Sequence, residues 1–245
     1  MNALPTGRLI GVGTGPGDPE LLTLKAARVL SEADVVAYFA KRGNNSNARA
    51  IVEARFRPDM LELPLLYPVT TEIDKDHDDY RSQITGFYEE SAEKVAEHLE
   101  AGRMVAVLSE GDPLFYGSYM HLHVRLAGRF PVEVIPGITA MSGCWSLAGL
   151  PIVQGDDVLS VLPGTMAEDQ LTRRLGDTEA AVIMKDGRNL PKIRRALESA
   201  GRLKEAVYVE RGTMANAAMI KLAERPDGDA PYFSLVLVPG WEASR

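Results

Sequence analysis

Cysteine is nearly absent from this chain of 245 residues: Cys144 is the only one, so no disulfide can form within the chain. Such scarcity is typical of proteins in a reducing compartment. The sequence contains no apolar run of about 18 residues, so it predicts no membrane-spanning helix. The first residues, MNALPTGR, lack the apolar core of a signal peptide. We therefore expect a cytoplasmic protein.

Positive charge is also in short supply. The chain has 27 Lys and Arg against 34 Asp and Glu, which gives a formal net charge of -7. Binding to a nucleic-acid backbone requires a surplus of basic residues, so this balance argues against nucleic acid as the main partner. A local basic pocket remains compatible with it. The hydrophobic share of 45% is typical of a soluble protein with one large domain or two small ones.

Short apolar runs alternate with longer amphipathic stretches. Several runs are rich in Val and Ile, which is typical of strands buried on both faces. Residues 19–31 and 80–102 have helical patterns; Asp18 and Pro19 suit the start of the first, and Gly102 the end of the second. This alternation predicts an α/β fold. The predicted strands are 8–13, 34–40, 60–66, 104–109, 132–136, 157–163, 180–184, 206–211 and 233–239.

We expect an N-terminal α/β domain at residues 1–127 and a C-terminal α/β domain at 128–245. The segment Gly-Arg-Phe-Pro, which begins at Gly128, follows a helical pattern and precedes a new strand. Residues 41–80 contain the polar, irregular stretches KRGNNSN and TTEIDKDHDDY. They are predicted as an elaborated loop region of the first domain.

Four glycines at alternate positions, Gly11, Gly13, Gly15 and Gly17, lie in and after the first strand. The dinucleotide fingerprint needs glycine at its first, third and sixth positions, and no register that starts at Gly11 or Gly13 provides the sixth. Pro16 lacks the backbone N–H that a pyrophosphate would need. The Gly-Lys-Ser/Thr of a P-loop is absent. A turn without a ligand and a loop that approaches some other ligand remain equal alternatives.

Two further loops repeat the plan of buried strand, turn and helix. In SEGDPLFYG (109–117), Gly111 permits a backbone conformation closed to other residues, and Asp112 stands where open α/β sheets bind ligands. A carboxylate there suits a ribose hydroxyl or a cationic ligand better than a phosphate; alternatively, Asp112 only caps the next helix. In VEVIPGITAMSG (132–143), Thr139 and Ala140 lie near a helix N-terminus. Three such loops favour a ligand site more than one does.

These loops resemble the tetrapyrrole (class III) S-adenosylmethionine-dependent methyltransferases. The resemblance is carried by VGTGPGDPELLTLKAARVLSEADVV (12–36), VLSEGDPLFYG (107–117) and VEVIPGITA (132–140). The later stretches AVIMKDGR (181–188) and YVERGTMANA (208–217) also resemble motifs of the family. The matches run in order over most of the chain, and the first three together are specific.

The resemblance implies two α/β domains with the cofactor and substrate cleft between them, and a homodimer. The implied cofactor is S-adenosylmethionine, which leaves as S-adenosylhomocysteine. The implied cofactor contacts are Pro16, Glu110, Gly111, Asp112, Phe115, Thr139, Ala140, Met184, Arg211 and Ala215.

Within the family, residues 62–72 and 132–165 are similar to the subgroup that methylates C20 of precorrin-2, giving precorrin-3A, in cobalamin biosynthesis. Uroporphyrinogen III methyltransferases have Gly-Gly-Asp where this chain has Glu110-Gly111-Asp112, which disfavours their activity. The cobalt-bearing substrate of the oxygen-independent route, cobalt-factor II, remains an alternative, although overall likeness favours the metal-free one. Another tetrapyrrole position, diphthamide or ribosomal RNA would keep the fold and change the acceptor.

Methyl transfer from a sulfonium to an electron-rich meso carbon depends mainly on proximity and alignment, which can supply about 7–11 kcal/mol. The sequence nominates no general base, and no catalytic residue is predicted. We expect Asp112 to orient the cofactor through its ribose or amino-acid moiety. The eight carboxylates of the substrate require local cations. Candidates are Lys41, Arg42, Arg49 and Arg81, each of which could instead be a solvated surface charge.

No metal site is expected. His121 and His123 are two residues apart, so on a helix they point to different faces. Cys144 adjoins Trp145 in an apolar stretch, which favours a buried structural thiol. Two other classes of function remain: a nucleotide-dependent oxidoreductase, against which the failed glycine register counts, and a non-catalytic protein that keeps the ligand site.

Overall fold

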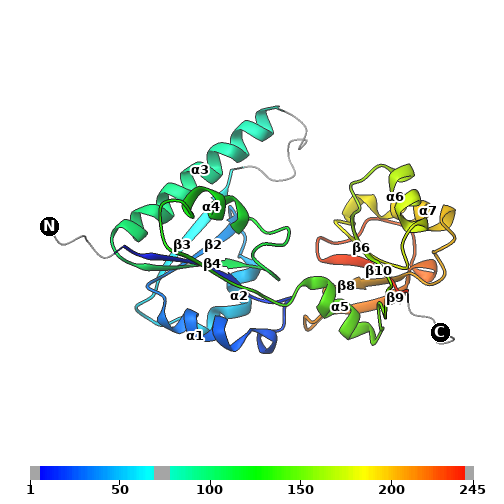
Figure 1. Ribbon diagram of the computed structural model, residues 1–245, viewed down its shortest axis with the longest axis horizontal. Coiled ribbons are helices and arrows are strands. Elements are labelled where there is room, and N and C mark those ends of the chain that lie inside the picture. The colour runs from blue at the N-terminus through cyan, green and yellow to red at the C-terminus, as the bar shows by residue number, and fades with distance from the viewer. Residues whose placement is uncertain (1–5, 69–77, 241–245) are drawn as a thin grey trace. The chain divides into compact units, whose positions relative to one another are not determined.

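The computed structural model describes residues 6–68 and 78–240, and in helix α3 the side chains from residue 82 onward. The chain forms two compact units, Met1–Thr139 and Ala140–Arg245 (Figure 1). Each unit has its own five-stranded sheet with helices on it, so the predicted α/β fold is confirmed. The division follows residue 139 rather than 127, because the strand at Val132–Ile135 pairs with the first strand of the chain.

The first unit is an open, wholly parallel sheet with strand order β3-β2-β4-β1-β5. Its elements are β1 (Arg8–Gly13), α1 (Leu24–Glu32), β2 (Val35–Lys41), α2 (Asn47–Val52), β3 (Leu61–Tyr67), α3 (Asp78–Glu100), β4 (Met104–Ser109), α4 (Tyr119–Leu126) and β5 (Val132–Ile135), with 3-10 turns at Pro19–Leu21 and Glu53–Arg55.

Side chains alternate between the two faces of this sheet, and helices cover both faces. On β1, Leu9 packs with α3 and α4, whereas Ile10 and Val12 pack with α1 and α2. Figure 1 shows the two helix pairs on opposite sides of the strands. Gly11 shares the face of Leu9, and a Cβ there would overlap the ring of the fully buried Tyr119 from α4. The near-continuous apolar runs of the sequence therefore reflect burial on both faces.

The ends of the helices follow local capping chemistry. The predicted helix at 19–31 is divided: Asp18 caps the 3-10 turn, and α1 begins only at Leu24, where the Thr23 hydroxyl accepts the N–H of Ala26 at 3.1 Å. Gly102 ends α3 as predicted, with φ of 78°. Its N–H donates to the carbonyl of Leu99, and the next N–H reaches back to His98, which is a Schellman motif.

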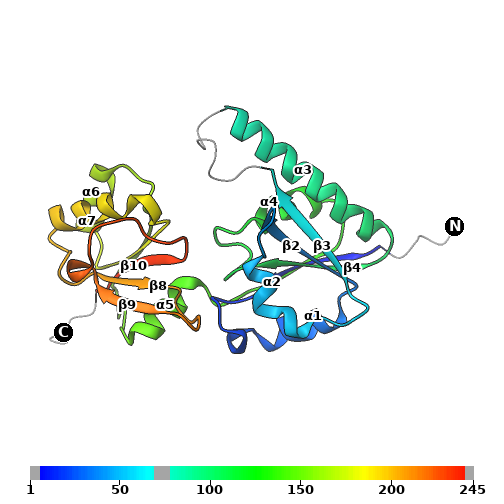
Figure 2. The same cartoon turned by 180° about the vertical axis from the view of Figure 1, so that it is seen from behind.

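The second unit has a mixed sheet with strand order β6-β7-β10-β8-β9, in which only β6 and β7 are parallel neighbours. Helices α6 and α7 cover one face and α5 the other (Figure 2). Its elements are α5 (Ala140–Ala148), β6 (Leu159–Pro163), α6 (Glu168–Gly176), β7 (Ala180–Met184), α7 (Leu190–Ser199), β8 (Val207–Glu210), β9 (Ala218–Lys221) and β10 (Ser234–Val238), with 3-10 turns at Gly187–Asn189 and Leu222–Glu224.

Helix α2 and strand β9 are among the elements that were not predicted. Helix α2 lies in the region assigned to loops, where the Ser46 hydroxyl caps it and Ala48, Ile51 and Val52 face the core. This helix has six residues and one strongly apolar pair, Ile51 and Val52, so it is too short to show a clear helical period of apolar residues. Strand β9 is an edge strand whose four residues are all exposed, so it carries no alternation of buried and exposed positions.

A buried carboxyl stands out in the second unit. Asp186 follows β7, is fully buried, and within the described residues neither of its carboxyl oxygens has a hydrogen-bond partner. The nearby Ser234 hydroxyl donates instead to the carbonyl of Pro231 at 2.8 Å. Burial raises the pKa of Asp186 to about 7, against a smaller opposing influence of Ser234 and Arg225. In the folded chain, the carboxyl group of Asp186 is therefore mostly protonated below about pH 7.

This carboxyl predicts a pH dependence of stability. The unfolded acid ionises near pH 4 and the folded one near pH 7, so its contribution to stability is complete below pH 4 and is lost as the pH rises to 7. Relative to the parent chain, Asp186→Asn should gain on the order of 2 kcal/mol in unfolding free energy between pH 5 and pH 7. Urea titrations at both pH values measure it, with Asp156→Asn as the exposed control. Parallel pH profiles for Asp186→Asn and the parent would contradict the prediction.

Candidate functional site

Three loops meet at the carboxyl edge of the first sheet. Strands β4, β1 and β5 are parallel neighbours, so the chain leaves all three at the same edge. The N–H and the hydroxyl of the buried Thr14 both donate to the carbonyl of Ser109, at 2.9 and 3.2 Å. Beyond it, Gly15 and Gly111 form an isolated antiparallel bridge, in which the Gly111 N–H donates to Gly15 at 2.8 Å. The loops after β1 and β4 are thus joined through their backbones.

Glycine is required where these loops approach one another. A Cβ on Gly13 would lie 2.6 Å from the Cα of Gly137 and 2.7 Å from the carbonyl oxygen of Gly111. A Cβ on Gly137 would overlap that same carbonyl oxygen. Gly15 and Gly111 also have positive φ values of 78° and 64°. Gly13 and Gly15 therefore serve contact between loops, which neither alternative drawn from the glycine spacing included.

Asp112 ties the loops after β4 and β5 together. One carboxylate oxygen accepts the N–H of Leu114 at 2.9 Å, and the other accepts the N–H of Gly137 at 3.1 Å. The first contact closes a local turn and does not cap the next helix, because α4 begins only at Tyr119, after Ser118. The second partner lies 25 residues further along the chain. Each oxygen keeps a second lone-pair direction. A half-buried carboxylate held this way can still accept hydrogen bonds from a ligand.

The position of Asp112 coincides with a topological switch point. The chain leaves β1 toward α1 on one face of the sheet and leaves its neighbour β4 toward α4 on the other face. Ligands of open α/β sheets bind where adjacent strands diverge in this way. Pro16 and Phe115 are half-buried in the two loops, and Thr139 is half-buried after β5. The structure thus gathers these predicted residues into the same three loops of the first unit.

The side chain of Glu110 has a different setting from the one expected of a cofactor contact. It accepts hydrogen bonds from the Asn47 side chain and from the backbone N–H of Ala48, at the start of α2. Burial raises the pKa of Glu110, and these two hydrogen bonds oppose the rise. Its carboxyl group therefore holds α2 against the end of β4. Its partner lies in a stretch that was predicted to be a loop.

In the second unit, β7 and β8 lie on either side of β10 and run parallel to each other. A turn follows each of these two strands. Met184 ends β7 and is half-buried; its carbonyl accepts the Gly164 N–H at 2.6 Å, and Lys185 follows with φ of 62°. Arg211 follows β8 with φ of 48°, and its guanidinium lies 3.5 Å from a carboxylate oxygen of Glu210. Positive φ in side-chain-bearing residues concentrates at functional sites.

The remaining predicted contacts of this unit are small or packed. Ala140 is the exposed first residue of α5, and Ala215 is exposed in the turn after Arg211. Gly212 packs on the sulfur of Cys144, and a Cβ there would overlap it. Cys144 is buried as expected, and burial raises the pKa of its thiol to about 12. A thiol with that pKa stays protonated near neutral pH and is unreactive.

The basic candidates divide into engaged and unengaged side chains. Arg49 pairs with Glu62 at 2.6 Å and with Glu53 at 3.0 Å, so its guanidinium is already neutralised. Lys41 and Arg42, at the carboxyl end of β2, are exposed and form no ion pair within the described residues. Arg81 lies on α3, and its side chain is outside the described part of the structure.

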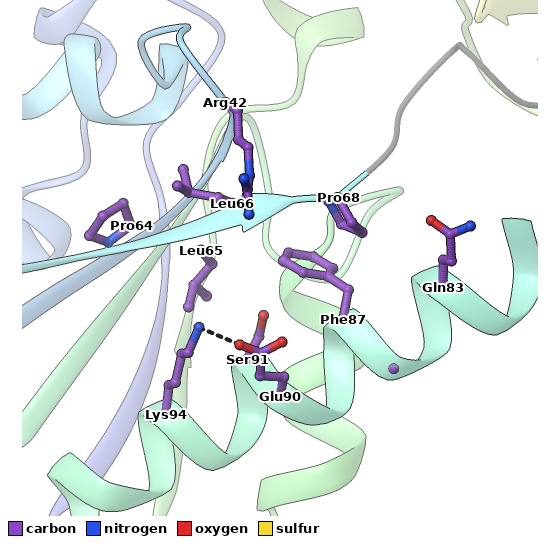
Figure 3. A pocket seen from close by; sticks show the side chains of 11 residues that line it. Arg42, Pro64, Leu65, Leu66, Pro68, Gln83, Phe87, Glu90, Ser91 and Lys94 are labelled. Carbon is purple, nitrogen blue, oxygen red and sulfur yellow. Dashed lines mark ion pairs between the residues drawn. The ribbon is translucent and has the colours of Figure 1, made fainter.

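Arg42 lines a cavity of about 380 Å³ between β3 and α3 (Figure 3). Leu66 of β3 and Phe87 of α3 form apolar parts of its wall. Its other cation, Lys94, pairs with Glu90 at 2.7 Å, as the dashed line in Figure 3 marks. Among the described residues of this cavity, Arg42 is therefore the cation without an ion-pair partner.

The two histidines of α4 make separate ring contacts. His121 stacks on Tyr88 at 3.9 Å between ring centroids, and His123 hydrogen-bonds the Tyr119 hydroxyl at 3.2 Å. Across the described residues, no three His, Cys, Asp or Glu side chains are grouped as metal ligands. Over the same residues, no helix combines the length and apolar character that a membrane crossing requires.

Comparison with known proteins gives a consistent assignment. Residues 8–225 match the family model of the tetrapyrrole (corrin/porphyrin) methylases. A precorrin-2 C(20)-methyltransferase from Sinorhizobium sp is 76% identical over 99% of both chains. A cobalt-precorrin-2 C(20)-methyltransferase from Salmonella typhimurium is 25% identical over 96% of this chain and 98% of its own.

Among solved structures, a uroporphyrin-III C-methyltransferase from Thermus thermophilus in complex with S-adenosylhomocysteine aligns with a TM-score of 0.66 and 26% identity. The alignment covers 94% of this chain and 97% of that one. Fold, loops and sequence agree: the chain belongs to the tetrapyrrole methylases.

Proposed function

We propose that this chain transfers a methyl group from S-adenosylmethionine to C20 of precorrin-2, giving precorrin-3A, in cobalamin biosynthesis. The observation that carries the proposal is the 76% identity to a precorrin-2 C(20)-methyltransferase over 99% of both chains. The relative named for the cobalt-bearing substrate is only 25% identical over a similar length, which favours the metal-free substrate.

The chemistry of the three loops suits this cofactor. S-adenosylmethionine supplies a methyl group already activated by a sulfonium, so the protein has to bind and align it. Residues 14–18 and 110–117 contain no Lys or Arg, but they offer the Asp112 carboxylate and many backbone groups. A carboxylate that still has free lone pairs is suited to ribose hydroxyls or an ammonium group, whereas a phosphate would need donors.

The proposed cofactor contacts of the first unit are Asp112 through its carboxylate, Glu110 and Gly111 through their backbones, and Pro16, Phe115 and Thr139 through loop packing. In the second unit we propose Ala140, Met184, Arg211 and Ala215, of which Met184 and Arg211 adjoin turns with positive φ. Restricting Glu110 to its backbone follows from the hydrogen bonds that its carboxyl group makes with α2.

For the polyanionic substrate, the proposal favours Lys41 and Arg42, which form no ion pair within the described residues, over the ion-paired Arg49. A substrate carboxylate at Arg49 would have to displace Glu62 or Glu53, which costs the existing contacts. The proposal also includes a homodimer that acts in the cytoplasm, which rests on the resemblance to the family; light scattering of the purified chain measures the assembly.

The direct test is methyl transfer. Purified chain, precorrin-2 and S-adenosylmethionine labelled in the methyl group should yield a tetrapyrrole that carries the label at C20, as read by NMR. Cobalt-bearing substrate in parallel should react more slowly. Label at another carbon, or cofactor binding without transfer to a tetrapyrrole, would contradict the proposed reaction.

The same assay tests Arg42. In Arg42→Gln the KM for the tetrapyrrole should rise about three- to tenfold, because one exposed charge-assisted contact is worth on the order of 1 kcal/mol. Arg28→Gln, which removes an exposed cation from α1, is the matched control. An unchanged KM in Arg42→Gln would exclude this residue from substrate binding.

Asp112 should affect both affinity and stability. Asp112→Ala removes the acceptor of the Leu114 and Gly137 N–H groups, so unfolding free energy should fall by about 1–3 kcal/mol. Calorimetry should show the affinity for S-adenosylmethionine reduced at least about tenfold. Asp34→Ala is the control, since Asp34 accepts the Met104 N–H at 2.8 Å where β4 begins, at the opposite edge of the sheet. Unchanged cofactor affinity in Asp112→Ala would end the assignment.

A further inference from the structure

Ser118 stands where the loop after β4 ends and α4 begins. Serine at this position commonly caps a helix by accepting a backbone N–H, but here the side chain makes no capping hydrogen bond. Its hydroxyl instead forms hydrogen bonds with the hydroxyl groups of two tyrosines. The Tyr88 hydroxyl donates to Ser118 Oγ at 3.2 Å, and the Tyr67 hydroxyl forms a second, short hydrogen bond with the same oxygen.

The two tyrosines come from other elements and are held by packing. Tyr67 is the last residue of β3, and Tyr88 lies in α3 with 7% of its surface exposed. Their rings belong to an aromatic cluster: Tyr67 lies 4.7 Å from Phe87 between centroids, and Tyr88 stacks on His121 at 3.9 Å. Both hydroxyls therefore belong to rings that are packed among other aromatic side chains of the first unit.

The other end of the loop is also fixed. Gly111 is bridged to Gly15, and Asp112 accepts the N–H of Gly137. Just before Ser118, a Cβ on Gly117 would lie 2.6 Å from the hydroxyl oxygen of Ser109 and 3.2 Å from the carbonyl oxygen of Pro113, so Gly117 packs closely against the end of β4.

Between these fixed ends the loop projects outward. Leu114 and Tyr116 are 49% and 48% exposed, and Tyr116 has a φ of 55° that side-chain-bearing residues rarely adopt. A tip with these properties needs support at both ends to keep one conformation.

We propose that Tyr67 and Tyr88 are positioning residues that act through Ser118. By holding the end of loop 110–118, they set the conformation in which Asp112 meets the cofactor. The identity of the ligand in this inference rests on the proposed function. The part that says the tyrosines hold the end of loop 110–118 does not. Phenylalanine in place of Tyr67 or Tyr88 would fill the same aromatic cluster. What the two hydroxyl groups add is therefore the hydrogen bonds with Ser118.

Four variants test the inference: Ser118→Ala, Ser118→Thr, the double variant Tyr67→Phe/Tyr88→Phe, and Tyr38→Phe. Tyr38 is the matched control, since its hydroxyl donates to Glu62 at 2.9 Å, away from the loop. Calorimetry should show the Kd for S-adenosylmethionine raised about tenfold in Ser118→Ala and in the double variant, the equivalent of one lost hydrogen bond. Ser118→Thr, which keeps the hydroxyl, and Tyr38→Phe should stay within about twofold of the parent.

Hydrogen exchange supplies a readout that does not depend on the cofactor. The amides of residues 111–117 should exchange faster in Ser118→Ala and in the double variant, and at the parental rate in Ser118→Thr. Unchanged exchange there, or equal losses of affinity in Tyr38→Phe, would overturn the inference. If the parent chain itself binds no S-adenosylmethionine, the proposed function fails, while the exchange rates still decide whether the tyrosines hold the loop.

Discussion

Close backbone contact among three loops is the constraint on which the first unit depends. The carbonyl of Gly111 lies so near Gly13 and Gly137 that a side chain on either glycine would collide with its surroundings. Strand order makes this contact necessary, because β4, β1 and β5 are neighbours and release their loops at one edge. Backbone hydrogen bonds from Thr14 and Gly111, together with the Asp112 carboxylate, then hold the loops at that distance.

The same contact explains why a nucleotide-like glycine pattern belongs to a methylase. In a dinucleotide fold the glycines let the backbone approach a pyrophosphate; here they let one backbone approach another. What remains exposed to a ligand is the acceptor capacity of Asp112 and of the loop carbonyls. An acceptor-rich edge matches a cationic donor, and the acidic chain leaves basic side chains such as Lys41 and Arg42 for the anionic substrate that we propose.

Residues close in sequence could be predicted, and those that meet from distant segments could not. Apart from β9, the strands of both sheets follow from apolar runs alone, and Gly102 follows from the local geometry of a helix end. By contrast, the contact of Asp112 with Gly137, the attachment of Glu110 to α2, and the two tyrosines on Ser118 join segments 25 to 63 residues apart. Composition and motif spacing in a single sequence do not indicate which distant residues will be in contact. Strand β9 was missed for another reason, since an exposed edge strand has no buried face to reveal it.

The account is tested most directly by a crystal structure of this chain with S-adenosylhomocysteine. It predicts that the ligand contacts the Asp112 carboxylate and the loops after β1 and β4, while the hydrogen bond between Asp112 and Gly137 stays in place. A ligand bound away from these loops, or one that binds only after that hydrogen bond breaks, would contradict the account.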